Sequence, residues 1–261
     1  MIHKGTAYQI TGPKGAPVVV LVHGLGLNSA VWQWLVPVLA RFRVITYDLI
    51  GHGQSAPPSG QPGLADLSRQ LADLLDGLDI AQAAIVGFSL GGMVARRFAQ
   101  DHPSRTLALV ILNSPYRRGP EAQAAIEARV AQSEAFGPAA TVEAALVRWY
   151  TDKARATRPD LMELTRSWVL ANDPKVYPRL YRVLAMGVDE ISAPHPALAC
   201  PTLVMTAEDD HGNSPDMSRA IAAEIAGSRL VILQGLRHMA LVEDPDAVNG
   251  PVQAFLTEVL G

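Results

Sequence analysis

A serine set between glycines is the first residue of this sequence whose surroundings suit covalent chemistry. Ser89 is the centre of the sequence GFSLG at 87–91, which fits the pattern G-x-S-x-G. The apolar residues Ala83–Gly87 before it predict a short strand, and Leu90–Asp101 after it predict a helix. A serine at such a strand-to-helix turn projects above the sheet as a nucleophile. Glycine-rich turns of this kind are also made for structural reasons alone, so it is the context that favours a nucleophile.

A histidine and an aspartate follow two later strands, where they can activate that serine. A serine hydroxyl is a weak nucleophile and needs a base, which a carboxylate in turn orients. His238 follows the predicted strand Arg229–Leu233, and Asp210 follows the predicted strand Thr202–Thr206. The carboxyl ends of parallel strands meet at the edge where open α/β sheets bind ligands. We therefore predict a catalytic triad of Ser89, Asp210 and His238.

The spacing leaves part of this prediction open. Glu208, Asp209 and Asp210 are consecutive, so at least two of these carboxylates must be solvated or structural. A loop histidine such as His238 can also cap or pack without taking part in catalysis.

A second glycine-rich turn, HGLG at 23–26, ends the predicted strand Val18–His23. Glycines at this position let backbone N–H groups turn inward. We expect the N–H groups of Leu25 and Leu90 to form an oxyanion hole, which stabilises a tetrahedral intermediate. The alternative is a tight turn of structural use only.

Other residues with reactive side chains are expected to be structural. His52 lies among glycines that suit a tight turn, and Cys200, the only cysteine, is expected to be a buried and inert thiol. His3, His102 and His195 are scattered without metal-ligand spacing, and neither a P-loop nor G-x-G-x-x-G occurs. We expect no metal and no cofactor.

The elements that must hold these residues alternate between strand and helix. Strands separated by helices of this length imply parallel pairing with right-handed crossovers. Residues 116–199 break the alternation, because they are Ala- and Arg-rich, helical in pattern and without a clear strand. We predict an α/β fold with a core of residues 1–115 and 200–261 and a helical cap of residues 116–199. The other predicted strands are Thr6–Thr11, Arg43–Tyr47 and Thr106–Leu112. The other predicted helices are 28–40, Leu64–Leu78, Pro215–Ala226 and Pro245–Leu260, and Pro37 is expected to bend or interrupt the first of them.

Composition limits the class of protein and of partner. With 261 residues, 49% of them hydrophobic and 18% charged, the chain can bury a sizeable core. Its net charge of −3 argues against a nucleic-acid partner. Val18–Val22 is too short to span a membrane, and the first residues contain no apolar signal region. We expect a cytoplasmic protein that acts on a small molecule; its oligomeric state is left open.

These motifs together resemble the α/β-hydrolase superfamily. HGLG at 23–26, D-x-x-GHG-x-S at 48–55, GFSLGG at 87–92 and the later acid and histidine blocks follow the family's order. The resemblance implies a mostly parallel twisted sheet flanked by helices, with an inserted helical lid. It assigns Asp210 as the acid with Asp209 as the alternative, since Ala207 replaces the family's usual glycine.

Within this superfamily the chain is most similar to 3-oxoadipate enol-lactonases, small carboxylesterases and haloperoxidase-like esterases. This similarity implies hydrolysis of a carboxylic ester or lactone through an acyl-serine intermediate. One alternative is hydrolysis of a C–C bond in a vinylogous diketone on the same triad. Others are a ligand-binding protein without turnover and an oxygenase or lyase built on the same fold.

Overall fold

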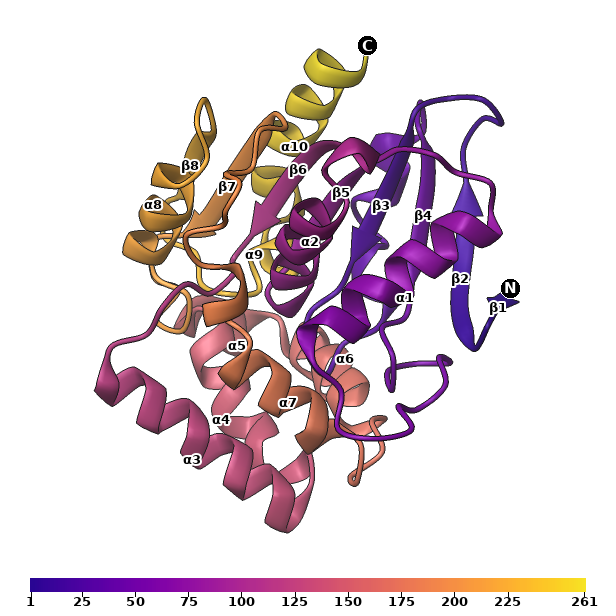
Figure 1. Cartoon of the computed structure of the whole chain (residues 1–261). Coiled ribbons are helices and arrows are strands. Elements are labelled where there is room, and N and C mark those ends of the chain that lie inside the picture. Colours follow the sequence, from indigo (N-terminus) through magenta and orange to yellow (C-terminus); the bar gives the residue numbers. More distant parts are fainter.

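The computed structural model describes all residues from 1 to 261, and an eight-stranded sheet runs through its centre (Figure 1). The strand order is β1-β2-β4-β3-β5-β6-β7-β8. Strand β2 pairs antiparallel with both β1 and β4, and the other five pairings are parallel. The predicted α/β fold is confirmed. The strands are β1 (Ile2–His3), β2 (Thr6–Thr11), β3 (Val18–Val22), β4 (Arg43–Tyr47), β5 (Ala83–Phe88), β6 (Thr106–Leu112), β7 (Thr202–Ala207) and β8 (Arg229–Leu233).

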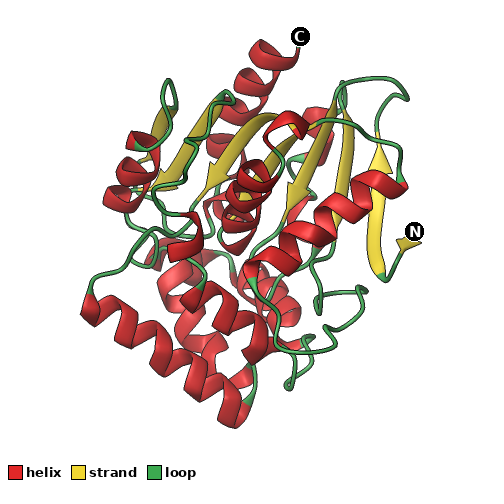
Figure 2. Ribbon diagram, viewed as in Figure 1, coloured by secondary structure: helices red, strands yellow, loops and turns green.

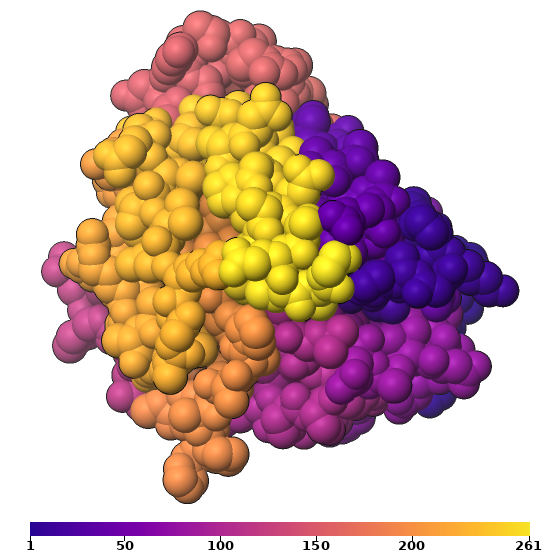
Figure 3. Space-filling model, turned by 90° about the horizontal axis from the view of Figure 1, so that it is seen from above, coloured from indigo at the N-terminus to yellow at the C-terminus, as the bar shows by residue number.

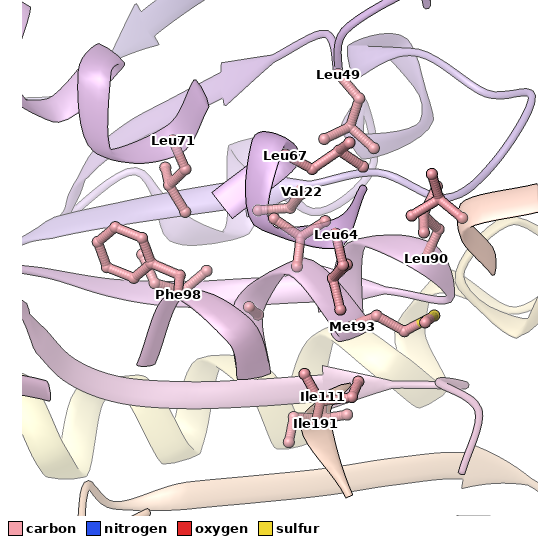
Figure 4. Packing of buried hydrophobic residues seen from close by; sticks show 14 of the residues in the cluster. Val22, Leu49, Leu64, Leu67, Leu71, Leu90, Met93, Phe98, Ile111 and Ile191 are labelled. Carbon is pink, nitrogen blue, oxygen red and sulfur yellow. The ribbon is translucent and has the colours of Figure 1, made fainter. Parts of the chain in front are cut away.

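The central strands are continuous apolar runs because helices cover both of their faces. Along β3, Val20 and Val22 belong to one core cluster, while Val19 and Leu21 belong to the other. Figure 4 shows the first cluster, in which Leu67 packs with its neighbours between helix and sheet. The two faces therefore bury two cores of similar size.

Two groups of helices make these layers. The first cluster lies under α1 (Leu64–Gly77), α2 (Leu90–Asp101) and α8 (Pro215–Ala223). The second cluster lies under the two 3₁₀ helices η1 (Ser29–Trp32) and η2 (Val36–Leu39) and the helices α9 (Ala240–Glu243) and α10 (Pro245–Leu260). The C-terminal helix lies beside N-terminal residues (Figure 3), where the side-chain amides of Asn249 and Gln253 donate to the carbonyls of Trp34 and Val38.

The stretch between β6 and β7, which we call the helical segment, contains no strand. It lies at one end of the sheet, below the arrowheads of the strands in Figure 2. The expected cap, residues 116–199, falls within this stretch, and its status as a separate unit stays a prediction. The helices of the segment are α3 (Pro120–Phe136), α4 (Ala139–Trp149), α5 (Asp152–Thr157), α6 (Pro159–Leu170), α7 (Tyr177–Met186) and η4 (Asp189–Ile191); η3 (Pro103–Arg105) precedes β6.

One predicted helix is not continuous. Residues 28–40 form the two short helices η1 and η2 rather than one α-helix. Asn28 caps η1, accepting a hydrogen bond from the amide of Ala30 at 3.0 Å. Pro37 lies in the first turn of η2, where its missing N–H costs nothing, and it cannot continue a helix from the residues before it.

Candidate active site

Ser89 occupies a strained turn between β5 and α2. Its φ of 55° and ψ of −115° are rare for a residue with a side chain. The chain passes so closely here that a Cβ on Gly87 would lie 2.2 Å from the carbonyl oxygen of Gly91. A Cβ on Gly91 would lie 2.0 Å from the carbonyl oxygen of Val22. The glycines of the motif are therefore required by packing, and they hold Ser89 at the carboxyl end of β5.

His238 and Asp210 form a buried pair at the same edge. Nδ1 of His238 lies 2.7 Å from Oδ2 of Asp210, and these residues are 7% and 2% exposed. The same carboxylate accepts hydrogen bonds from Nδ2 of Asn113 at 2.9 Å and from the amides of Gly212 and Asn213 at 3.1 and 2.9 Å. These donors fix the orientation of the Asp210 carboxylate, whose Oδ2 is shared between Asn113 and the imidazole of His238.

The other two acids of the consecutive three lie elsewhere. Asp209 is exposed, and its amide donates to the carbonyl of Leu236 at 3.0 Å. The carboxylate of Glu208 accepts from the amide of Gly235 at 3.0 Å. Asp210 is thus the one carboxylate of the three that contacts His238.

Asn113 is a residue of this edge that the sequence reasoning missed. It directly follows β6, as Ser89 follows β5, and it combines a φ of 47° with a buried side chain. Its position after a buried strand was a usable signal, because every other residue of the site follows a strand in the same way.

The ring of His238 is held between two aromatic side chains. Its centroid lies 4.9 Å from that of Phe88 and 5.8 Å from that of Trp149. The amide of Met239 donates to the carbonyl of Trp149 at 2.9 Å, which joins the histidine loop to α4. The helical segment therefore contributes to the placement of the imidazole.

The HGLG turn brings backbone amides next to Ser89. The amide of Leu27 donates to the carbonyl of Gly24 at 3.2 Å, and Gly26 has φ +75°, as the third residue of such a turn requires. The Leu25 amide bonds no group of the protein, and Leu90 is the first residue of α2, whose amide has no partner within the helix. A Cβ on Gly24 would lie 3.1 Å from that of Ser89, so the turn packs against the serine.

Two buried histidines accept backbone amides at this turn and at the neighbouring loop after β4. Nε2 of His52 accepts the amide of Gly26 at 3.0 Å, and Nε2 of His23 accepts the amide of Leu49 at 2.9 Å. Burial lowers the pKa of His23, and burial with a smaller contribution from His23 lowers the pKa of His52 to about 3. The structural role expected for His52 is thereby explained, because a protonated ring could not accept the Gly26 amide.

The HGLG turn, Ser89, Asp210 and His238 form the floor of a cavity whose roof is the helical segment. Floor residues include Leu25, Ser89 and His238, and the space that the centre of a water molecule can reach is about 70 Å³. The roof presents three arginines and three aromatic residues, which are Arg118, Arg129, Arg148, Trp149, Tyr177 and Tyr181. The sequence showed that this stretch is rich in arginine, but nothing in it indicated which arginines face inward.

The molecule contains neither a cluster of metal-ligating side chains nor a helix that could span a membrane. No group of three or more His, Cys, Asp and Glu side chains is arranged to hold a metal ion. None of the helices combines the length and the apolar character needed to cross a bilayer. Cys200 was expected to be buried but is only half-buried, and burial raises the pKa of its thiol.

Comparisons with known proteins agree with this geometry. The crystal structure of the enol-lactonase from Burkholderia xenovorans LB400 superposes with a TM-score of 0.89 at 29% identity, covering 97% of this chain and 96% of that one. A thermophilic esterase from Thermogutta terrifontis gives a TM-score of 0.89 at 27% identity, over 98% and 94% of the two chains. A curated relative, (E)-2-((N-methylformamido)methylene)succinate hydrolase of Acinetobacter baylyi, is 25% identical over 96% of this chain and 94% of its own. Since the family model described as alpha/beta hydrolase fold also matches residues 17–245, the chain belongs to the alpha/beta hydrolase family, and its activity is that of a hydrolase.

Proposed function

We propose that the protein hydrolyses a carboxylic ester or lactone through an acyl-serine intermediate. The observation that carries the proposal is the buried pair of His238 and Asp210 beside the strained Ser89 in one cavity. Relatives named as an enol-lactonase and an esterase support the reaction class. In this proposal Ser89 is the nucleophile, His238 the base and Asp210 the orienting acid.

The hydrogen bonds of the imidazole determine which nitrogen acts as the base. Nδ1–H of His238 donates a hydrogen bond to Asp210, so Nε2 keeps its lone pair and takes the proton of the Ser89 hydroxyl. The serine oxygen attacks the carbonyl carbon, and the amides of Leu25 and Leu90 donate to the oxyanion that forms. His238 then protonates the leaving oxygen, which breaks the ester bond, and afterwards removes a proton from the water that hydrolyses the acyl-serine.

A fluorophosphonate reagent tests the nucleophile directly, because it phosphonylates only an activated serine. Intact-mass analysis should show one adduct on the wild type and none on Ser89→Ala. Ser114→Ala is a matched control, since Ser114 is also a buried serine that follows a strand at this edge. Labelling of Ser89→Ala would contradict the proposal by placing the activated serine elsewhere. No labelling of folded wild type would contradict it and favour a binding protein, an oxygenase or a lyase.

The alternative of C–C bond hydrolysis uses the same nucleophile and needs a substrate test. We expect the wild type to release acid from esters or lactones faster than it cleaves a vinylogous diketone of similar size. The reverse order of kcat/KM would retain the triad and overturn the substrate class.

A further inference from the structure

The roof of the cavity contains three arginines without a carboxylate partner. Arg118, Arg129 and Arg148 all line the space above Ser89, yet none of them lies within 4 Å of an acidic side chain. Most other arginines of the chain are ion-paired; Arg166 of α6, for example, bonds two glutamates. Arg41, Arg43 and Arg179 are the other arginines without an ion pair, so half of the unpaired arginines of the chain line this one cavity.

The single acid of the cavity is not available to these arginines. Both oxygens of Asp210 accept hydrogen bonds, from His238 and Asn113 on one side and from two backbone amides on the other. The carboxylate of Asp210 is thus fully used by its own hydrogen-bond donors, and the three positive charges of the roof have no compensating charge within the cavity.

The guanidinium groups keep donors free for a ligand. Nε of Arg129 donates to the hydroxyl of Tyr181 at 3.1 Å, which orients the group and leaves both terminal nitrogens unbonded. Arg148 uses one terminal nitrogen, on the carbonyl of Ala144 at 2.9 Å. Arg118 makes only long contacts, of 3.3 and 3.4 Å, to two carbonyls of α7. A guanidinium has five N–H donors in a planar fork, so most of them are unused here.

The three charges also repel one another. Burial, with a smaller contribution from the nearby charge of Arg129, lowers the pKa of Arg118 to about 10. Burial and the same Arg129 lower the pKa of Arg148. Like charges held together in a partly buried cavity destabilise a fold unless a bound anion compensates them.

From this arrangement we propose that Arg118, Arg129 and Arg148 form a carboxylate subsite, and that the substrate is a small ester or lactone carrying a free carboxylate. The inference rests on the proposed function, because it places the reactive carbonyl at Ser89 and the carboxylate beneath the roof. A carboxylate can accept two parallel N–H bonds from one guanidinium, and it fits a narrow cavity.

Two esters of matched size test this charge preference. Monomethyl glutarate and methyl pentanoate differ only in that a carboxylate replaces a terminal methyl group. We expect kcat/KM of the wild type to be at least ~100-fold higher for the monomethyl glutarate, since a charge-assisted hydrogen bond contributes roughly 10- to 100-fold to binding. Equal rates, or faster hydrolysis of the neutral ester, would overturn the subsite.

Arginine variants test whether the preference for the anionic ester comes from the roof of the cavity. Arg129→Gln and Arg148→Gln should each lower kcat/KM for the anionic ester by ~10-fold or more and change it for methyl pentanoate by less than about 3-fold. The matched control is Arg179→Gln, since Arg179 belongs to α7, has no ion pair and does not line the cavity. Similar losses for both esters would mean that these arginines are only structural.

Binding and labelling separate the subsite from the catalytic proposal. Calorimetry should detect glutarate binding to Ser89→Ala and at least ~10-fold weaker binding when Arg129→Gln is added. Normal fluorophosphonate labelling without glutarate binding or charge preference would overturn the subsite alone. Absent labelling with Arg129-dependent glutarate binding would overturn the esterase proposal and retain the anion site.

Discussion

The imidazole of His52 accepts the Gly26 amide, and so holds the HGLG turn, only while it is neutral. Burial lowers the pKa of His52 from 6.5 to about 3, so between these pH values the unfolded chain binds a proton that the folded protein does not. Below pH 6.5 the free energy of unfolding should therefore fall by up to ~1.4 kcal/mol per pH unit from this residue. Urea unfolding between pH 8 and pH 5 measures the slope.

The histidine variants provide the control for this pH dependence. His52→Gln removes the titrating ring but keeps an acceptor for the Gly26 amide, so it should unfold with a smaller pH slope. His195→Gln, at an exposed position, should keep the slope of the wild type. An unchanged slope in His52→Gln would contradict the assignment of His52 as a buried neutral acceptor.

A single glycine determines the position of the Leu25 amide. Gly26 has φ +75°, and an added Cβ would lie 3.0 Å from the Tyr177 ring. Gly26→Ala should displace the turn and lower kcat by ~10- to 100-fold, since the loss of one oxyanion donor costs up to about 10³. Gly15→Ala is the control, because Gly15 has φ +94° with nothing within 4 Å of its added Cβ. That variant should lose only ~1 kcal/mol of stability and no activity.

The residues of the edge were predictable from sequence because each follows a buried strand. Ser89, Asp210 and His238 could be placed at one edge for that reason alone, and the structure brings them to one cavity. Their hydrogen-bond partners were not predictable. The contact between Asn113 and Asp210 joins residues about a hundred positions apart in the chain, and no local pattern records such a contact.

At the level of elements, the histidine loop is fastened to α4. Nη1 of Arg237 donates to the carbonyls of Val147 and Tyr150 at 3.0 and 2.9 Å. Arg237→Met should let His238 shift from its place and lower kcat by ~10-fold, with little change in KM, because small displacements of a catalytic group slow the chemical step. Stopped-flow kinetics with an activated ester measures both constants.

Another arginine of the same region serves as the control for the loop. Arg229 lies in β8 and forms an exposed ion pair with Glu258, away from the cavity. Arg229→Met should leave kcat unchanged. Equal losses in the two variants would mean that the effect of Arg237 is on general stability rather than on the position of His238.

Helix boundaries were predicted less well than helix content. The leucine spacing of residues 64–78 and the resumed alternation after residue 200 gave elements that the structure contains, with ends within a few residues. The prediction of a single helix over residues 28–40 was wrong, because Pro37 and the local packing favour two 3₁₀ turns. Short-range hydrogen bonds decide such a stretch, and apolar spacing does not report them.

At the level of the whole molecule, one buried arginine connects helix α2, which covers the sheet, to residues near both ends of the helical segment. Arg96 of α2 donates to the carbonyls of Pro115 and Ile191 at 3.1 and 2.7 Å, and Glu224 lies 3.7 Å away. Arg96→Leu should destabilise the fold by ~3 kcal/mol, because it leaves these groups without their donor. Arg97→Leu removes a more exposed arginine of the same helix and should cost less than ~1 kcal/mol by urea unfolding.

The distribution of charge over the molecule predicts that a bound dicarboxylate stabilises the folded state. The chain has a net charge of −3, yet the roof of its cavity is positive, a contrast that composition alone cannot show. A dicarboxylate that binds the roof should stabilise the folded state by ~2.7 kcal/mol at 100 times its Kd, which raises Tm by roughly 2–4 °C per kcal/mol. Thermal unfolding of Ser89→Ala with glutarate, against sodium chloride of equal ionic strength, measures this shift without turnover. The shift in Tm should disappear when Arg129→Gln is added and persist when Arg179→Gln is added. Equal shifts with glutarate and with chloride would show that general screening, and not the three arginines, stabilises the protein.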